Sequence, residues 1–274
     1  MNLLKSLTYI PIKRYNPETL DYRDRIIANG GTISDTSIDA IEKFVEDCKN
    51  ALVWDKLLEV ASFAGTNLNA ALVKLVYPAG VPGVITNVNF VAGDYTETGA
   101  NGGLLGDGAT KYLNTGFNAQ TYLPDNAHLS FYLREDVRVA GNRGLLGTIS
   151  GTDQYWLGSL TPASQVNVRL AQTVSATLAA PMDKGFYIGT RTSLSQLRLY
   201  KNGALAATDT TAVVHARPNL NLYAFGWNAG GIAGGYVPAR GSYYSIGQAL
   251  NATEAAALHD AVQALQRNLN RDVA

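Results

Sequence analysis

Aromatic rings next to glycines and amides are the side chains of this 274-residue sequence best suited to binding chemistry. A Tyr or Trp ring packs its flat face on apolar surface, such as the face of a sugar ring, while Asn bonds hydroxyl groups. Side chains alternate along a strand, so about half of these rings must point into a core. The others could stack on a sugar or lie in a protein interface. The candidates for a glycan- or partner-binding site are Tyr155, Trp156, Tyr223, Trp227, Asn228 and Tyr236.

A hydrolytic function would need two carboxylates, because a glycosidase places one on each side of the scissile sugar bond. Beyond residue 100 the sequence contains only two glutamates, Glu135 and Glu254. Glu254 follows Asn251 by three residues, the spacing of a helix capping box. Glu135 and Asp136 are adjacent, so on a strand they would point to opposite faces. We therefore expect no catalytic residues and no enzymatic activity, and keep a polysaccharide-degrading, glycosidase-like enzyme as the alternative.

Cofactor and metal motifs are missing from the sequence. His128, His215 and His259 lie far apart, and none has a second His or Cys at metal-ligand spacing. The glycines between residues 103 and 111 do not have the spacing of a nucleotide-binding loop. Cys48 belongs to an apolar helical pattern, which favours a core thiol over a reactive one. We expect no cofactor and no bound metal.

The charge balance limits the classes of partner. The 22 basic and 22 acidic side chains give a formal net charge of +0, and only 16% of the residues are charged. Nucleic-acid binding requires clustered basic side chains, whereas the densest cluster here is Lys13-Arg14. No apolar run approaches the roughly 20 residues of a membrane-spanning helix. We expect neither a nucleic-acid partner nor insertion into a membrane.

The N-terminal part of the chain is predicted to be helical over residues 21–80. Apolar side chains recur there at intervals of three and four, which places them on one helix face. They are Ile38, Ile41, Val45, Cys48 and Leu52. A second short helix is expected over Val53–Phe63. Residues 81–110 are rich in Gly and are expected to form a long connection into the main domain.

The first 20 residues are predicted to be a docking arm. Their apolar side chains have no core of their own, and an exposed apolar tip usually needs a partner. These side chains are Leu3, Leu4, Leu7, Tyr9, Ile10 and Ile12.

The periodicity changes to two over residues 111–250, which predicts many short strands separated by turns. The clearest signal is the pair Asn202-Gly203 between alternating apolar residues, the favoured filling of a two-residue hairpin. Short strands at this spacing indicate a mainly β, antiparallel jelly-roll sandwich. Residues 251–274 are predicted to form a C-terminal helix that packs on it. The helix would present one apolar edge, made of Leu258, Val262, Leu265 and Leu269.

Residues 89–116 carry a specific resemblance. The stretch NFVAGDYTETGANGGLLGDGATKYLNTG is similar to the entry into concanavalin A-like/laminin G-like jelly rolls of structural proteins from tailed bacteriophages and prophages. Weaker similarities follow in HLSFYLR at 128–134, LYKNG at 199–203 and YYSIGQAL at 243–250. The resemblance extends over about residues 20–270. It supports the sandwich prediction with a helical N-terminal segment and a C-terminal helix.

This resemblance implies a structural protein of the virion, assembled in the host cytoplasm. Such proteins occur in tail fibres, baseplates or capsid decorations, and the choice between capsid and tail stays open. The implied partners are other virion proteins, further copies of the chain in a homo-oligomer, and host-surface carbohydrate bound by a lectin-like domain. The family has no fixed catalytic motif, and the calcium ligands of laminin G domains have no counterpart in this sequence.

Overall fold

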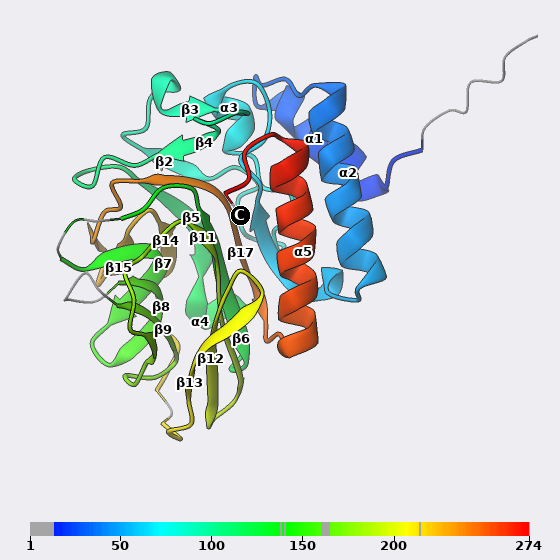
Figure 1. Cartoon of the computed structure of the whole chain (residues 1–274). Coiled ribbons are helices and arrows are strands. Elements are labelled where there is room, and N and C mark those ends of the chain that lie inside the picture. The colour runs from blue at the N-terminus through cyan, green and yellow to red at the C-terminus, as the bar shows by residue number, and fades with distance from the viewer. Residues whose placement is uncertain (1–13, 138, 140, 160–164, 214, 274) are drawn as a thin grey trace, which may run out of the picture.

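A computed structural model describes residues 14–137, 139, 141–159, 165–213 and 215–273 (Figure 1). The side chains expected to form the docking arm, from Leu3 to Ile12, lie outside these residues. The described chain folds into three layers, which are a group of helices and two β-sheets (Figure 1). This arrangement confirms the predicted fold class, a mainly β antiparallel sandwich with an N-terminal helical segment and a C-terminal helix.

The first sheet, sheet 1, is next to the helices. Its strands are β1 (Leu57–Ala61), β3 (Tyr95–Thr96), β4 (Gly103–Leu105), β6 (Ala127–Leu133), β11 (Gly185–Ser193), β12 (Gln196–Lys201), β13 (Ala204–Asp209) and β17 (Arg240–Gln248). They follow the order β13-β12-β11-β6-β17-β4-β3, with β1 also paired to β17. The neighbouring strands of sheet 1 are antiparallel.

The second sheet, sheet 2, packs on the other side of sheet 1. Its strands are β2 (Thr86–Val88), β5 (Tyr112–Asn118), β7 (Arg143–Ser150), β8 (Asp153–Ser159), β9 (Val166–Leu170), β10 (Ala176–Leu178), β14 (Asn221–Ala224), β15 (Trp227–Ala229) and β16 (Ile232–Gly234). Seven of them follow the order β10-β9-β8-β7-β14-β5-β2. The β15–β16 hairpin attaches to β7, where β15 and β7 run parallel.

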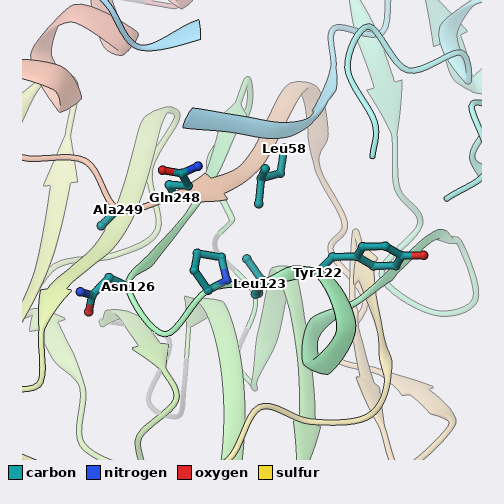
Figure 2. A pocket seen from close by; sticks show the side chains of 7 residues that line it. Leu58, Tyr122, Leu123, Asn126, Gln248 and Ala249 are labelled. Atoms are coloured by element: carbon teal, nitrogen blue, oxygen red, sulfur yellow. The ribbon is translucent and has the colours of Figure 1, made fainter. Parts of the chain in front are cut away.

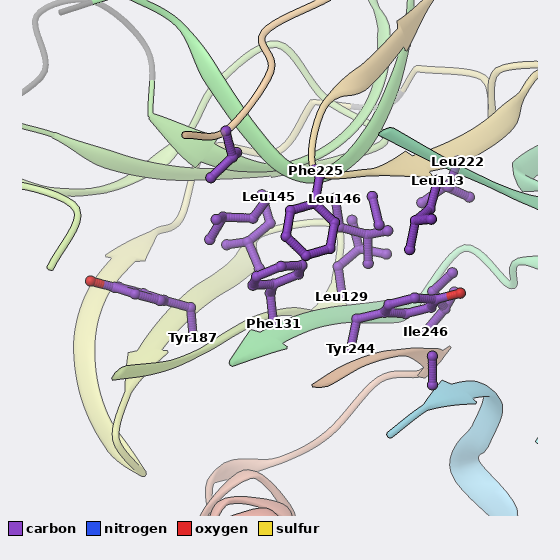
Figure 3. Close-up of a cluster of buried hydrophobic side chains, with 14 of the residues drawn as sticks. Leu113, Leu129, Phe131, Leu145, Leu146, Tyr187, Leu222, Phe225, Tyr244 and Ile246 are labelled. Atoms are coloured by element: carbon purple, nitrogen blue, oxygen red, sulfur yellow. The ribbon is translucent and has the colours of Figure 1, made fainter. Parts of the chain in front are cut away.

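The main hydrophobic core lies between the two sheets. Figure 3 shows Phe225 and Leu146 on one side of this core and Phe131 and Leu129 on the other. The ring of Phe225 makes edge contacts with Phe131 and Phe90, with 5.3 Å between ring centroids in each pair. Burial of these apolar side chains is the dominant favourable term for joining the sheets.

A second core lies between sheet 1 and the helices. The helices are α1 (Pro17–Ala28), α2 (Asp35–Asn50) and α5 (Ala252–Asn268), with α2 and α5 side by side in Figure 1. Sheet 1 contributes Tyr132, Phe186 and Tyr243 to this layer. The helices therefore cover the outer face of sheet 1. Among the described helices, none has both the length and the apolar character needed to cross a membrane.

Two sequence features predicted for the helices are present, the apolar stripe of α2 and the capping box of α5. Ile41 and Cys48 are buried on one side of α2, and burial raises the pKa of the Cys48 thiol. The Asn251 side chain accepts a bond from the Glu254 N–H, and Glu254 accepts one from the Asn251 N–H, so the capping box is confirmed. Leu52 is 82% exposed, so the apolar stripe of α2 ends before it.

Two expectations about the N-terminal third were wrong. Instead of a helix over Val53–Phe63, the chain forms a short 3-10 turn at Trp54–Lys56 and then β1. The Gly-rich stretch expected as a connection contributes β2, β3 and β4 to the sheets. Pairing with β17 and β5, which are distant in sequence, overrides the local propensity of these segments.

Candidate functional site

The outer face of sheet 2 is a sheet surface that the helices do not cover (Figure 1). Strand β5 shows this most clearly, because burial alternates along it. Leu113 and Phe117 point into the main core. Tyr112 and Asn114 lie on the opposite, partly exposed side of the strand. This strand therefore presents a ring and an amide to solvent.

Strand register brings distant residues onto this same face. Tyr223 pairs with Asn114 of β5 on one side and with Gly147 of β7 on the other. Gly147 in turn pairs with Trp156 of β8. Directly paired residues share a face of a sheet, so Asn114, Tyr223 and Trp156 form one row across four strands.

Aromatic rings are stacked along this row. Tyr112 stacks on Tyr223 with 4.7 Å between ring centroids and an interplanar angle of 28°. The ring of Tyr236 is tilted against that of Tyr112, with 6.2 Å between the ring centroids. The ring of Trp227 packs on that of Trp156 in a tilted arrangement, with 4.7 Å between the centroids. The outer members, Tyr112, Trp227 and Tyr236, are half-buried and keep part of their surface in solvent.

Side-chain amides flank the tyrosine stack. Asn221 Nδ2 lies 3.3 Å from Asn114 Oδ1, and Asn118 Nδ2 donates to Asn219 Oδ1 at 2.9 Å. An amide side chain carries two N–H donors and an oxygen with two lone pairs. These pairs therefore leave donors and acceptors for hydroxyl groups of a ligand.

Glycines fix the position of the Trp227 ring. A Cβ atom on Gly235 would lie 1.7 Å from this ring, and the backbone of Gly235 has a φ of +59°. Asn228 holds the same hairpin, because its Nδ2 donates to the Asn221 carbonyl and its Oδ1 accepts from the Gly231 N–H. The hairpin is thus built to hold one ring in place, which reduces the entropy lost on binding.

The predicted site residues divide by orientation. Trp227, Asn228, Tyr236, Tyr223 and Trp156 come together on the outer face of sheet 2. Among these, Trp227 and Tyr236 are the rings with substantial exposed surface, since Tyr223 is 8% and Trp156 1% exposed. Asn228 is buried as well and acts on the hairpin rather than on solvent.

Tyr155 does not belong to this face. It points into the core between the sheets and is 0% exposed, because it is one residue out of phase with Trp156 on β8. Tyr112 and Asn114 were not predicted as site residues. The signal was present, since tyrosine and asparagine alternate with apolar residues from Tyr112 to Asn118.

The electrostatics of this face suit an uncharged ligand. Strands β5, β14, β15 and β16 contain no charged residue. Two guanidinium groups lie on neighbouring strands. Arg143 donates to the Tyr236 carbonyl at 2.8 Å, and Arg169 donates to Gln154 and Ser175. Burial lowers the pKa of Arg169.

The carboxylates considered for hydrolysis are engaged elsewhere. Glu135 pairs with Arg240 at 3.2 Å, and Glu254 pairs with Lys56 at 2.6 Å while it caps α5. In the part of the chain that the structure describes, no group of three or more His, Cys, Asp or Glu side chains is placed to hold a metal ion.

A histidine and two serines form a buried network on the outer face of sheet 1. His128 Nε2 lies 3.0 Å from Ser245 Oγ, which lies 2.6 Å from Ser130 Oγ. His128 Nδ1 is 2.6 Å from the Gln248 carbonyl. All three side chains are 0% exposed, and burial lowers the pKa of His128 to about 4. The network resembles a nucleophile–base pair in composition, but its burial fits a structural role.

His259 lies on α5 and is half-buried. Its ring stacks on Phe186 of sheet 1 with 6.2 Å between centroids. It is therefore a packing residue between α5 and the sheet.

Comparison with known proteins gives a likeness in fold. The sequence matches no protein-family model, and no curated protein matches it. Domain 4 of AbnA, an extracellular GH43 arabinanase from Geobacillus stearothermophilus solved with arabinotriose, has a TM-score of 0.52 and 12% identity. The match covers 74% of this chain and 98% of that domain.

Two further solved structures are more distant. The CBM40 domain of a Ruminococcus gnavus sialidase, bound to α2,3-sialyllactose, has a TM-score of 0.41 and 15% identity over 53% of this chain and 91% of that one. A structure of botulinum neurotoxin type C, described as interacting with two ganglioside molecules, has a TM-score of 0.42 and 11% identity. It covers 58% of this chain and 42% of that one. The likeness to the arabinanase domain supports the β-sandwich fold.

Proposed function

We propose that this chain is a non-catalytic domain that binds neutral glycans on the outer face of sheet 2. One observation carries the proposal. On an uncovered sheet face, the half-buried rings of Tyr112, Trp227 and Tyr236 lie beside the amides of Asn114 and Asn221. Rings supply the apolar contact for a sugar, and the amides supply the hydrogen bonds that orient it.

The charge pattern favours a neutral glycan over an acidic one. Strands β5, β14 and β15, which supply Tyr112, Asn114, Asn221 and Trp227, carry no cation that would pair with a carboxylate. The solved arabinanase domain with the same fold, bound to arabinotriose, supports a neutral oligosaccharide as the first class to test. Engagement of Glu135 and Glu254 in ion pairs supports a binding function without hydrolysis.

We further propose that this chain is a component of a phage particle. This proposal rests on the sequence resemblance at residues 89–116. The chain would be a component of a tail fibre, baseplate or capsid decoration, assembled in the host cytoplasm. Residues 1–16 would dock it to other virion proteins. Deleting them should leave a folded protein that no longer joins the particle, and normal incorporation would contradict this role.

The binding proposal is tested by calorimetric titration with arabinotriose, maltotriose, cellotriose and sialyllactose. We expect one or more of the neutral trisaccharides to bind. Substituting Tyr112→Ala or Trp227→Ala should weaken that binding about tenfold, the loss of roughly one aromatic contact. Tyr77→Ala is the matched control, because Tyr77 is half-buried but lies against Arg25 near α1. Absence of binding to every neutral glycan, or release of new reducing ends, would contradict the proposal.

A further inference from the structure

A groove of about 560 Å³ lies at one mouth of the sandwich. Figure 2 shows Leu58 and Gln248 on one side of it and Leu123 on the other. Leu58 comes from β1 and Gln248 from the end of β17, both in sheet 1. Leu123 and Tyr122 come from α4 (Ala119–Tyr122) and its end, directly after β5 of sheet 2. This volume is in the usual range for a small-molecule site.

The lining combines apolar walls with two free amides. Leu58 and Tyr122 are half-buried and provide apolar surface, whereas Leu123, which also lines the groove, is 1% exposed. The side chains of Asn126 and Gln248 are exposed, and neither forms a side-chain hydrogen bond to the described residues. An apolar wall with a few convergent polar groups is the usual composition of a small-ligand site.

The groove carries no net charge at its rim. Its lining residues are all uncharged. Two ion pairs lie beside it. Lys56 Nζ is 2.6 Å from Glu254 and also donates to the carbonyl of the lining residue Ala249. Arg217 lies 3.9 Å from Asp125. Because each charge next to the groove has an opposite partner, the groove favours an uncharged ligand over an ionic one.

The two walls are tied to each other and to the core. The Ala249 N–H donates to the Asn126 carbonyl at 3.0 Å, which joins the end of β17 to the start of β6. Arg217 donates to the Leu123 carbonyl, and Tyr155 donates to the Pro124 carbonyl at 3.4 Å. The groove is therefore formed before a ligand arrives, which lowers the cost of binding.

We propose that this groove is a second sugar subsite, which holds one or two units of a neutral glycan. The ring faces would lie on the apolar wall, and neighbouring hydroxyl groups would bond the amides of Gln248 and Asn126. The proposal rests on the proposed glycan-binding function, but its residues are separate from those of the outer face of sheet 2.

The experiment starts from a Tyr112→Ala/Trp227→Ala double variant, in which the outer face is weakened. This variant is titrated with the same neutral trisaccharides while amide shifts are followed by NMR. We expect residual binding, with shifts at Gln248 and Asn126. Adding Gln248→Ala should weaken the residual binding at least about fivefold. The matched control is Gln120→Ala, an exposed glutamine on α4 that does not line the groove.

The outcomes separate the two proposals. If the intact protein binds a neutral glycan and the double variant binds none, the groove is not a subsite and the outer face stands as the only one proposed. If residual binding is unchanged by Gln248→Ala and by Asn126→Ala, the groove proposal is also overturned. If the intact protein binds no neutral glycan, both proposals fail. Circular dichroism of each variant confirms that it is folded.

Discussion

The outer faces of the two sheets carry similar rings in opposite environments. On sheet 1, Tyr132, Phe186 and Tyr243 are at most 1% exposed, because α2 and α5 lie over them. On sheet 2, Tyr112 and Trp227 stack on other rings but keep part of their surface in solvent. The position of the helices therefore decides which rings stabilise the fold and which remain for a ligand.

The largest expected effect is the loss of a ring from the covered face. Phe186 packs against Tyr243 at 5.8 Å and Tyr132 at 6.0 Å. Phe186→Ala should lower the free energy of unfolding by about 3–5 kcal/mol through lost burial and a cavity. Tyr112→Ala should cost less, about 1 kcal/mol, because its ring is already partly hydrated. Urea unfolding of both variants checks the comparison, and equal losses would contradict it.

A buried ion pair joins the two sheets, and removing half of it should have an effect of similar size. Lys74 Nζ lies 2.8 Å from Glu59 of sheet 1 and donates to the Thr115 carbonyl of sheet 2, and Tyr244 donates to Glu59. Both charged side chains are 0% exposed. Glu59→Gln should destabilise the protein by about 3–5 kcal/mol, because it leaves an uncompensated buried charge.

The control for this pair is the double variant Glu59→Leu/Lys74→Met, which removes both charges. It should be close to the wild type in stability. Thermal and urea unfolding of the single and double variants measure the difference. A double variant that is less stable than Glu59→Gln would show that the pair itself, rather than an orphaned charge, holds the sheets together.

His128, on the outer face of sheet 1, should also make the free energy of unfolding depend on pH in the acidic range. Burial lowers the pKa of His128 from 6.5 to about 4. Below about pH 6.5 the unfolded chain binds a proton that the folded protein does not. Stability should therefore fall as the pH drops from 6.5 to 4, by about 3 kcal/mol in total from this residue.

Melting temperatures measured across this pH range test the contribution of His128. The variant His128→Gln keeps a hydrogen-bonding side chain but does not titrate. Its melting temperature should change less with pH than that of the wild type, even if it is lower throughout. Parallel pH profiles for the two proteins would show that other groups cause the acid sensitivity.

Local signals predicted much of the fold. The α2 stripe, the capping box at Asn251 and Glu254, and the hairpin at Asn202-Gly203 each depend on residues close in sequence. In the hairpin both turn residues have positive φ, +50° at Asn202 and +77° at Gly203. Strand β1 was missed because its pairing partner, β17, is almost 200 positions away along the numbering, as in the pair Leu57 and Gly247.

The candidate site was predictable only in part. The sequence identified Trp227 and Tyr236, which lie on the uncovered face, but it also selected Tyr155, which points into the core. Alternation along a strand predicts that Tyr155 and Trp156 face opposite ways, but not which one faces inward. That choice depends on which side of β8 packs against sheet 1. The importance of Tyr112 depends on which sheet the helices cover.

The most direct test of the central claim is an NMR titration of the intact protein with arabinotriose, maltotriose and cellotriose. Binding on the uncovered face predicts amide shifts on β5, β14 and the β15–β16 hairpin that saturate with concentration. The amides of α2 and α5 over sheet 1 should not shift. Shifts confined to the helices, or no saturable shifts on sheet 2 with any of the three sugars, would contradict the account.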